Sequence, residues 1–392
     1  MINIIKKDIY QKIIKIHGKG KLEVNEPPYH KSFIQFLNKA VREKELSSVG
    51  KYTAHFEKKI ISYCKSKYCF ATNSGTSALH LVLKSLGIGL NDEVLVPSLT
   101  FAGTVNSISY CNANPHFIDS NIKSNFGIDV EKLDNFLEKN FFFDKKKKLK
   151  NKLSKNTVKA IISVHVYGFS SNILKLKKIA KKYRLYLIED AAGAFGSKIN
   201  NKYLGTFADA GIYSFNGNKI ITTGGGGAVV TNNKSLFNKI YKLGTTSKKK
   251  HPYKYLHDKI GYNYRMPSIN AALGLAQLKV LSKILNKKQL LHKLYLKKFK
   301  ELKYAKIYKS KNITDNNWIN ILILSDKLKK NTDQVIKFLH QNKIKAKPVW
   351  KLMSTLNHFK KYPKMNLNGS NEIYNKTILL PSSVKFNLSN TN

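Results

Sequence analysis

Short apolar runs alternate with helix-like runs from residue 67 to residue 231, and this alternation constrains the fold more than any other feature. Several runs end in polar or turn residues, and helical stretches such as 173–183 lie between them. The pattern is typical of a mostly parallel sheet covered by helices. We therefore predict an α/β fold whose seven strands are KYCFAT (67–72), DEVLVPS (92–98), HFIDS (116–120), KAIISVHVY (159–167), LYLIED (185–190), GIYSF (211–215) and GAVVT (227–231).

Three units are predicted along the chain. An N-terminal helical segment, 1–45, is expected to pack on a small C-terminal domain, 256–392, and a large domain, 46–255, lies between them. The lysine-rich segment 141–156 interrupts the strand and helix pattern, so we predict a solvated surface insertion there. Pro267 and Ser268 signal the start of a long helix.

Composition limits the partners that this chain can have. The 392 residues carry a formal net charge of +47, with 70 Lys and Arg against 23 Asp and Glu. The lysines are spread over most of the chain, and an abundance of Lys, Asn, Ile and Tyr is what A/T-rich codons produce. A basic balance alone carries no base readout, so we expect no specific nucleic-acid function.

The compartment and the metal content are also constrained. No run of 18 uncharged apolar residues occurs, and the N-terminus lacks the apolar segment of a signal peptide, so we expect a cytoplasmic protein without a membrane span. Cys64, Cys69 and Cys111 fit no zinc spacing. They are expected to be buried thiols, and we predict no metal site.

Two polar motifs follow predicted strands. NSGTSALH (73–80) opens a helix, where Gly75 permits close approach of a ligand and Thr76 joins the free N–H groups of the first turn in accepting an anion. The same residues also make an ordinary N-cap and turn. Asp190, in LIEDAAGAFG (187–196), could hold a protonated ring nitrogen, or it could be a helix N-cap or a surface ion pair.

A third motif surrounds one lysine. In SFNGNKIITTGGGG (214–227), Lys219 follows a strand and precedes four glycines. Lysine forms an imine with an aldehyde and its pKa shifts readily, which suits it to that bond and to proton transfer. Ser214 could reach the anion held by Thr76. The lysine precedes the glycines, which excludes a Walker A loop.

A fourth motif is GYNYRM (261–266), in which Asn263 is either a structural amide or a ligand contact from another part of the assembly. Together, an imine-forming lysine, an aspartate for a ring nitrogen and a phosphate cradle describe a site for pyridoxal 5'-phosphate (PLP). Each motif is weak alone, and their order and co-occurrence carry the prediction.

These motifs resemble the DegT/DnrJ/StrS-type nucleotide-sugar aminotransferases, which are fold-type-I PLP enzymes. The likeness covers nearly the whole chain and includes 47–60, 73–110, 162–168, 188–197, 213–232, 251–278 and 347–353. SFNGNKIITTGGGG, the SSVGK start and PVWKLM are most similar to the branch of legionaminic-acid and bacillosamine-type pathways. That branch transfers an amino group from glutamate to C4 of a UDP-4-keto-6-deoxy-N-acetylhexosamine, for surface polysaccharides such as lipopolysaccharide.

The resemblance implies a role for each site residue. Lys219 would bond to PLP and shuttle the proton, and Asp190 would hold the pyridinium nitrogen. Thr76, Ser214 and the backbone at Gly75 would hold the phosphate. Phe101 would stack on the cofactor ring. Asn263 would complete the phosphate site of a neighbouring subunit, which makes the expected active unit a homodimer. His165 lies in the family's HxYG turn and receives no chemical role.

The chain departs from the family's pattern in three places. Gly193 stands where many relatives carry a Gln that helps to hold the cofactor, and Phe195 replaces a later His. Ser354 follows PVWKLM where His is usual. Relatives usually continue beyond LPSSVKFNLSNTN (380–392) into another helix, so the small domain is expected to be shortened. The alternatives are a PLP-dependent sugar dehydratase, against which Lys219 argues because those relatives carry His there, and a non-catalytic regulatory protein.

Overall fold

The computed structural model describes residues 2–385, so the end of the C-terminal segment (386–392) lies outside the described residues. Its largest sheet follows the order β1-β11-β10-β7-β6-β2-β3. Only β11 runs antiparallel to its neighbours on this path, and the other pairs are parallel. The strands are β1 (Tyr68–Thr72), β2 (Asp92–Pro97), β3 (Asn114–Ile118), β6 (Thr157–Val164), β7 (Tyr186–Asp190), β10 (Ala210–Ser214) and β11 (Gly227–Thr231).

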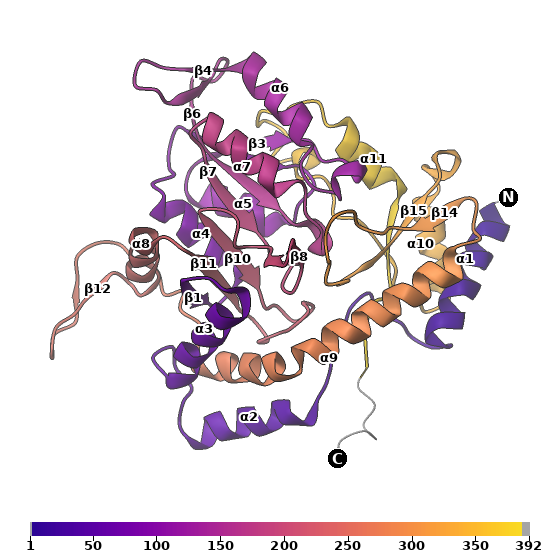
Figure 1. The fold of residues 1–392 in the computed structure, drawn as a ribbon, viewed down its shortest axis with the longest axis horizontal. Coiled ribbons are helices and arrows are strands. Elements are labelled where there is room, and N and C mark those ends of the chain that lie inside the picture. The colour runs from indigo at the N-terminus through magenta and orange to yellow at the C-terminus, as the bar shows by residue number, and fades with distance from the viewer. Residues whose placement is uncertain (1, 386–392) are drawn as a thin grey trace.

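The seven predicted strands match these seven, and helices cover both faces of their sheet. Figure 1 shows α7 in front of the sheet and α4 and α5 behind it. Every residue of β2, β10 and β11 is buried, which explains their nearly continuous apolar sequences. The helices are α1 (Ile2–His17), α2 (Lys31–Arg42), α3 (Lys51–Cys64), α4 (Gly75–Ser85), α5 (Ala102–Tyr110), α6 (Val130–Asn140), α7 (Ile173–Lys182), α8 (Lys234–Gly244), α9 (Ser268–Phe299), α10 (Thr332–Gln341) and α11 (Asn368–Lys376).

The lysine-rich segment 141–156 does more than cover the surface. It forms a hairpin of β4 (Phe141–Phe143) and β5 (Leu149–Asn151), and β5 pairs with β6, so the sheet has nine strands. Phe141, Leu149 and Asn151 are buried, while the lysines at the turn are exposed. The prediction of a solvated insertion was therefore right for the turn and wrong for the strands, because a few apolar residues among the lysines suffice to pair with the sheet edge.

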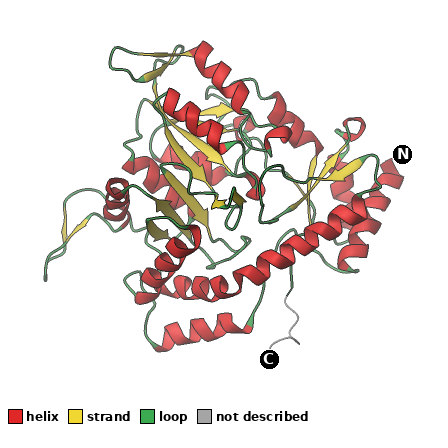
Figure 2. Cartoon of the chain, in the orientation of Figure 1, coloured by secondary structure: helices red, strands yellow, loops and turns green. Residues whose placement is uncertain are grey.

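A second, antiparallel sheet follows the long helix α9, as Figure 2 shows. Its order is β14-β15-β17-β16, from β14 (Ala305–Ile307), β15 (Asn320–Leu324), β16 (Lys347–Pro348) and β17 (Thr377–Leu380). Helix α9 extends from α3, beside the large sheet, to α1 at the other end of the molecule (Figure 1). The N-terminal helix α1 packs against α10, where the rings of Tyr10 and Phe338 meet edge to face with centroids 6.2 Å apart.

Two small hairpins lie outside these two sheets. One consists of β8 (Lys198–Ile199) and β9 (Lys202–Tyr203), and the other of β12 (Lys248–Lys249) and β13 (Leu256–His257). All three cysteines are buried and free. None of the helices within residues 2–385 combines the length and the apolar content that crossing a membrane requires.

Candidate active site

One cavity of about 460 Å³ lies where the parallel strands β6, β7 and β10 end. Strand register produces this convergence, because Asp190 at the end of β7 pairs with Val164 of β6 on one side and Ile212 of β10 on the other. Ligands of open α/β sheets bind at such strand ends. Six of the seven predicted site residues line the cavity: Gly75, Thr76, Phe101, Asp190, Ser214 and Lys219.

The loop after β10 presents Lys219 to this cavity. A tight turn forms first, in which the N–H of Lys219 donates to the carbonyl of Asn216 at 3.0 Å. The chain then returns through Gly224, whose φ of +79° favours glycine, and enters β11 at Gly227. A Cβ atom at Gly227 would lie 2.6 Å from the backbone of Ser74 and Gly75. The glycine run therefore lets β11 begin directly against the start of α4.

Burial changes the chemistry of the Lys219 amine. Burial lowers the pKa of Lys219 from 10.5 to about 8, while the charge of Asp190 acts in the opposite direction. Nζ lies 3.9 Å from the centroid of the Trp318 ring. An amine with such a pKa is neutral in an appreciable fraction of molecules near neutral pH, which is the form that attacks an aldehyde.

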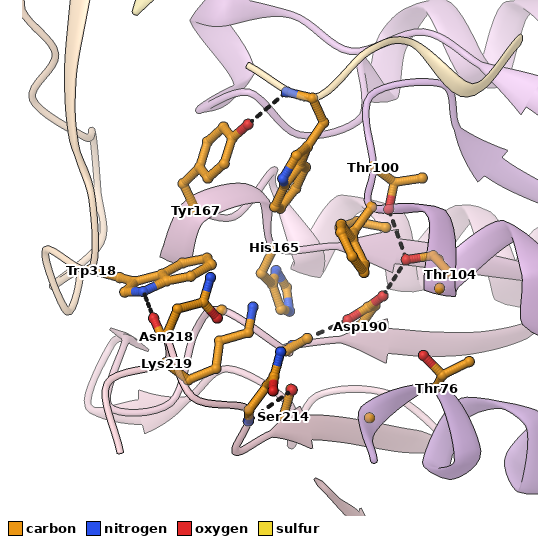
Figure 3. A pocket seen from close by; sticks show the side chains of 18 of the residues that line it. Thr76, Thr100, Thr104, His165, Tyr167, Asp190, Ser214, Asn218, Lys219 and Trp318 are labelled. Atoms are coloured by element: carbon orange, nitrogen blue, oxygen red, sulfur yellow. Dashed lines mark hydrogen bonds between the residues drawn. The ribbon is translucent and has the colours of Figure 1, made fainter. Parts of the chain in front are cut away.

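The carboxylate of Asp190 is buried and held from two sides. The hydroxyl of Thr104 donates to Oδ2 at 2.7 Å, and the N–H of Ala192 donates to Oδ1 at 3.1 Å. Thr100 in turn donates to Thr104 at 2.8 Å, so three residues form one chain of hydrogen bonds (Figure 3). Asp190 is 5% exposed, and within residues 2–385 no helix begins directly after it. Neither a helix N-cap nor a surface ion pair therefore describes this residue.

The start of α4 supplies the donors for an anion. Ser74 caps the helix by accepting from the N–H of Ser77 at 3.0 Å, whereas the N–H groups of Gly75 and Thr76 precede the first intrahelical bond. A Cβ atom at Gly75 would lie 3.0 Å from Cβ of Ser214, so the glycine permits β10 and α4 to approach. Figure 3 shows the hydroxyls of Thr76 and Ser214 at the same end of the pocket. These donors fit a phosphate group.

Aromatic rings form the opposite wall. Phe101, whose side chain is 60% exposed, has its ring centroid 6.0 Å from that of Trp350. Tyr167 lies 4.4 Å from Trp350 and 6.3 Å from Trp318, again between centroids. Three further aromatic residues therefore share the wall with Phe101, whose stacking on the cofactor ring stays a prediction.

The remaining predictions near the site have separate outcomes. His165 lines the cavity, and its Nε2 lies 2.9 Å from Oε2 of Glu189, which gives the ring a structural partner. Ser354 is buried and bonds to Ser98 at 2.8 Å, which accounts for a small hydroxyl residue after PVWKLM. Asn263 is exposed and does not line the cavity, and its carbonyl accepts from Asn73 at 3.5 Å. Its role in a neighbouring subunit stays a prediction.

Sequence reasoning missed several residues of the site. Thr104 and Thr100 flank Phe101 and could have been found from their proximity to it along the chain. Trp350 lies within the quoted PVWKLM motif but was given no role. Trp318 and Asn25 carried no signal, because they lie far along the chain from Lys219 and reach the cavity only through the tertiary fold. Within residues 2–385, no group of three or more His, Cys, Asp or Glu side chains is placed to hold a metal ion.

Three groups meet at one edge of this α/β sheet: a lysine amine of lowered pKa, a buried carboxylate and the free N–H groups of a helix. This combination defines a fold-type-I PLP-dependent enzyme. The residues present fit the cofactor, since its aldehyde, its ring nitrogen and its phosphate would meet the Lys219 amine, the Asp190 carboxylate and the donors at the start of α4. The chain belongs to the DegT/DnrJ/EryC1/StrS aminotransferase family, whose sequence profile matches residues 28–391. It is a PLP-dependent sugar aminotransferase.

Individual relatives support this assignment. GDP-perosamine synthase of Vibrio cholerae is 34% identical over 366 residues, which cover 92% of this chain and 94% of that protein. UDP-4-amino-4,6-dideoxy-N-acetyl-beta-L-altrosamine transaminase of Campylobacter jejuni is 36% identical and covers 72% of this chain and 70% of its own. The solved structure of Helicobacter pylori PseC, an aminotransferase of pseudaminic acid biosynthesis, superposes with a TM-score of 0.82 at 26% identity, over 92% of this chain and 94% of that one.

Proposed function

We propose that this protein transfers an amino group from glutamate to the C4 keto group of a nucleotide-linked 4-keto-6-deoxy sugar. The observation that carries the proposal is the meeting of Lys219, Asp190 and the start of α4 in one cavity. The name of the Campylobacter jejuni relative, a 4-amino-4,6-dideoxy sugar transaminase, supports C4 as the position. The expected UDP-N-acetylhexosamine type is not confirmed, because a GDP-perosamine synthase matches over more of the chain.

PLP, when bound, supplies an electrophilic aldehyde and an electron-withdrawing ring. In this proposal the Lys219 amine would hold the cofactor by its aldehyde group and would carry the proton that moves at the reacting carbon. Asp190 would accept a hydrogen bond from the protonated ring nitrogen, and Thr104 would keep the Asp190 carboxylate in place. Gly75, Thr76 and Ser214 would bind the phosphate, and Phe101 would pack on the ring.

The sugar nucleotide would enter beside the second sheet. Lys347 and Trp350 line that side of the cavity, together with residues 23–25 of the N-terminal segment. A lysine suits a diphosphate, and an aromatic face suits the apolar face of a sugar ring. This side of the pocket is therefore where selection between nucleotides is expected.

We further propose that the active unit is a homodimer in which Asn263 reaches the phosphate of the partner's site. The hairpin β12–β13 and its connection to Asn263 project from the body of the molecule (Figure 1). Tyr253, Tyr255 and Ile260 on this projection are 79%, 82% and 86% exposed. Large apolar side chains gathered on one projection are typical of a surface that a second chain covers.

A substrate panel tests the proposed reaction. The purified protein with PLP is offered UDP- and GDP-linked 4-keto-6-deoxy sugars, each with glutamate, and the products are identified by mass and NMR. Amination at C4 of at least one sugar, with 2-oxoglutarate formed in equal amount, is the expected result. Amination of none of the sugars while PLP is bound to Lys219 would overturn the proposal.

A further inference from the structure

Two side chains from distant parts of the chain converge on the carbonyl group directly before Lys219. The indole Nε1–H of Trp318 donates to the carbonyl of Asn218 at 2.7 Å, and the amide of Asn25 donates to the same oxygen at 2.8 Å. Figure 3 shows the bond from Trp318. Asn25 belongs to the connection between α1 and α2, and Trp318 precedes β15. Both lone pairs of one backbone oxygen are thus occupied from outside its own loop.

A buried lysine fixes the orientation of both donors. Lys288 on α9 is 2% exposed, and its ammonium donates to Oδ1 of Asn25, to the carbonyl of Trp318 at 3.1 Å and to the carbonyl of Ser382 at 2.5 Å. The carbonyl of Asn218 can only accept, so the NH₂ group of the Asn25 amide must face Asn218 and its oxygen must face Lys288. Burial lowers the pKa of Lys288 to about 7, and in its ammonium form all three of its protons are used in these bonds.

The ring of Trp318 also covers the Lys219 amine. Nζ lies 3.9 Å from the ring centroid, which is within the range of a cation–π interaction. The ring reaches this position only because residue 193 is glycine, since a Cβ atom there would lie 2.7 Å from Cζ3 of the indole. Asn316 strengthens the junction by donating to the carbonyls of Gly193 and Phe195 at 2.9 and 3.0 Å.

We propose that Trp318 and Asn25 are positioning residues that hold the Asn218–Lys219 turn, and with it the Lys219 amine, in the orientation needed to reach the cofactor. Lys288 ties the two donors together, and Gly193 leaves the space that the indole occupies. In this chain the Trp318 ring therefore fills the place next to residue 193. We call the two hydrogen bonds from Trp318 and Asn25 to the Asn218 carbonyl the tether. The catalytic consequence of this inference rests on the proposed function, but the tether itself is a property of the protein without cofactor.

Three variants separate the effect of losing these hydrogen bonds from the effect of altered side-chain packing. Trp318→Phe keeps an aromatic ring and removes the N–H donor, Asn25→Ala removes the second donor, and Gly193→Ala displaces the indole. Gly217→Ala is the matched control, because it lies beside Asn218 and a Cβ atom there meets nothing within 4 Å. Circular dichroism first establishes that each variant folds.

The first readout is hydrogen exchange of the peptide spanning 215–220 in the protein without PLP. We expect about tenfold faster exchange in Trp318→Phe and Asn25→Ala, which is what the loss of one hydrogen bond of about 1.4 kcal/mol produces. Gly193→Ala should behave likewise, and Gly217→Ala should match the wild type. Exchange unchanged within twofold in both donor variants overturns the tether. If Trp318→Phe does not fold, Asn25→Ala alone decides.

The second readout is capture of PLP by Lys219, measured by fixing the bond with borohydride and following the modified peptide over time. We expect capture and kcat to fall about tenfold in both donor variants. In Trp318→Phe, which leaves Lys347, Trp350 and residues 23–25 unchanged, KM for the sugar nucleotide should stay within about twofold. Equal capture rates in wild type and variants overturn the positioning role. Absence of PLP capture by wild-type Lys219 defeats the proposed function instead, because the exchange experiment is independent of the cofactor.

Discussion

The hydroxyl of Thr104 donates to Oδ2 of Asp190 at 2.7 Å, in a position where both residues are buried. A hydrogen bond to a charged group contributes about 1.5–3 kcal/mol, and an unpaired buried acceptor costs about as much. We therefore expect Thr104 to do for Asp190 what we propose that Trp318 and Asn25 do for Lys219, which is to fix the direction of a group that would meet the cofactor.

Replacement of Thr104 tests this relationship. Thr104→Val keeps the side-chain shape and removes the hydroxyl, so we expect the free energy of unfolding to fall by about 1–3 kcal/mol and kcat to fall about tenfold. Thr104→Ser, which retains the donor, should stay close to wild type. Chemical denaturation and steady-state kinetics measure both effects. Equal activity of the Val and Ser variants would show that Asp190 does not need this bond.

Asp190 is expected to affect the reactivity of the bound cofactor more than the affinity with which the cofactor binds. Asp190→Asn preserves the shape but removes the charge that favours a protonated ring nitrogen, so the ring withdraws electrons less strongly. We expect the variant still to bind PLP on Lys219, with amination slowed at least about tenfold. Absorbance of the bound cofactor and single-turnover rates provide the measurement. Wild-type rates in the Asn variant would leave Asp190 with a structural role only.

The pKa of Lys219, lowered by burial to about 8, predicts the pH dependence of its reactivity without cofactor. Acetylation of the Lys219 peptide, resolved by mass spectrometry, should rise with pH around a midpoint near 8. This midpoint lies far below the midpoint expected for surface lysines. Because the charge of Asp190 raises this pKa, Asp190→Asn should move the midpoint to lower pH. A midpoint near 10.5 or a shift to higher pH would contradict the prediction.

The same pKa shift has a consequence for stability. Between pH 8 and pH 10.5 the unfolded chain holds a proton on Lys219 that the folded chain does not. This group therefore makes the stability of the cofactor-free protein rise with pH across that window. Lys219→Met removes the contribution, so its unfolding midpoint should change less steeply with pH than that of the wild type.

Lys219→Ala is expected to fold and to bind PLP weakly and without a covalent link. Loss of proton transfer alone costs about 10²–10⁴-fold in rate, and loss of the covalent bond adds to this. Borohydride followed by peptide mapping should find no phosphopyridoxyl group on the large domain of the variant. If PLP were trapped on another lysine of the pocket and the variant still turned over substrate, the assignment of Lys219 as the catalytic lysine would be wrong.

Asn263 tests the proposed dimer. If each subunit lends Asn263 to its partner, Lys219→Ala and Asn263→Ala chains refolded together form heterodimers with one intact site and one site that carries both defects. At limiting PLP, the activity of the mixture should exceed the mean of the two parents, because intact sites bind cofactor more tightly. No gain despite confirmed heterodimers would place Asn263 outside the neighbouring site.

The sequence by itself determined seven strands of the large sheet and its α/β character. Apolar runs of strand length, separated by amphipathic helices, bury both faces of a parallel sheet, and the loops that follow parallel strands lie at one edge of it. The sequence therefore predicted that one edge of the sheet would hold Asp190, Ser214, Lys219 and the start of α4. The predicted domain limits at 45/46 and 255/256 stay predictions.

Only the tertiary structure decided what surrounds those groups. Trp318, Asn25 and Lys288 have no local pattern that marks them, because their partners lie far along the chain and meet them through the packing of α9 and the second sheet on the large domain. The need for glycine at position 193 likewise became visible only in the fold. The sequence shows a residue without a side chain there, and the structure shows that the Trp318 indole occupies the adjacent space. Short-range periodicity encodes burial and the type of each element, whereas strand order and hydrogen bonds between distant segments depend on the completed fold.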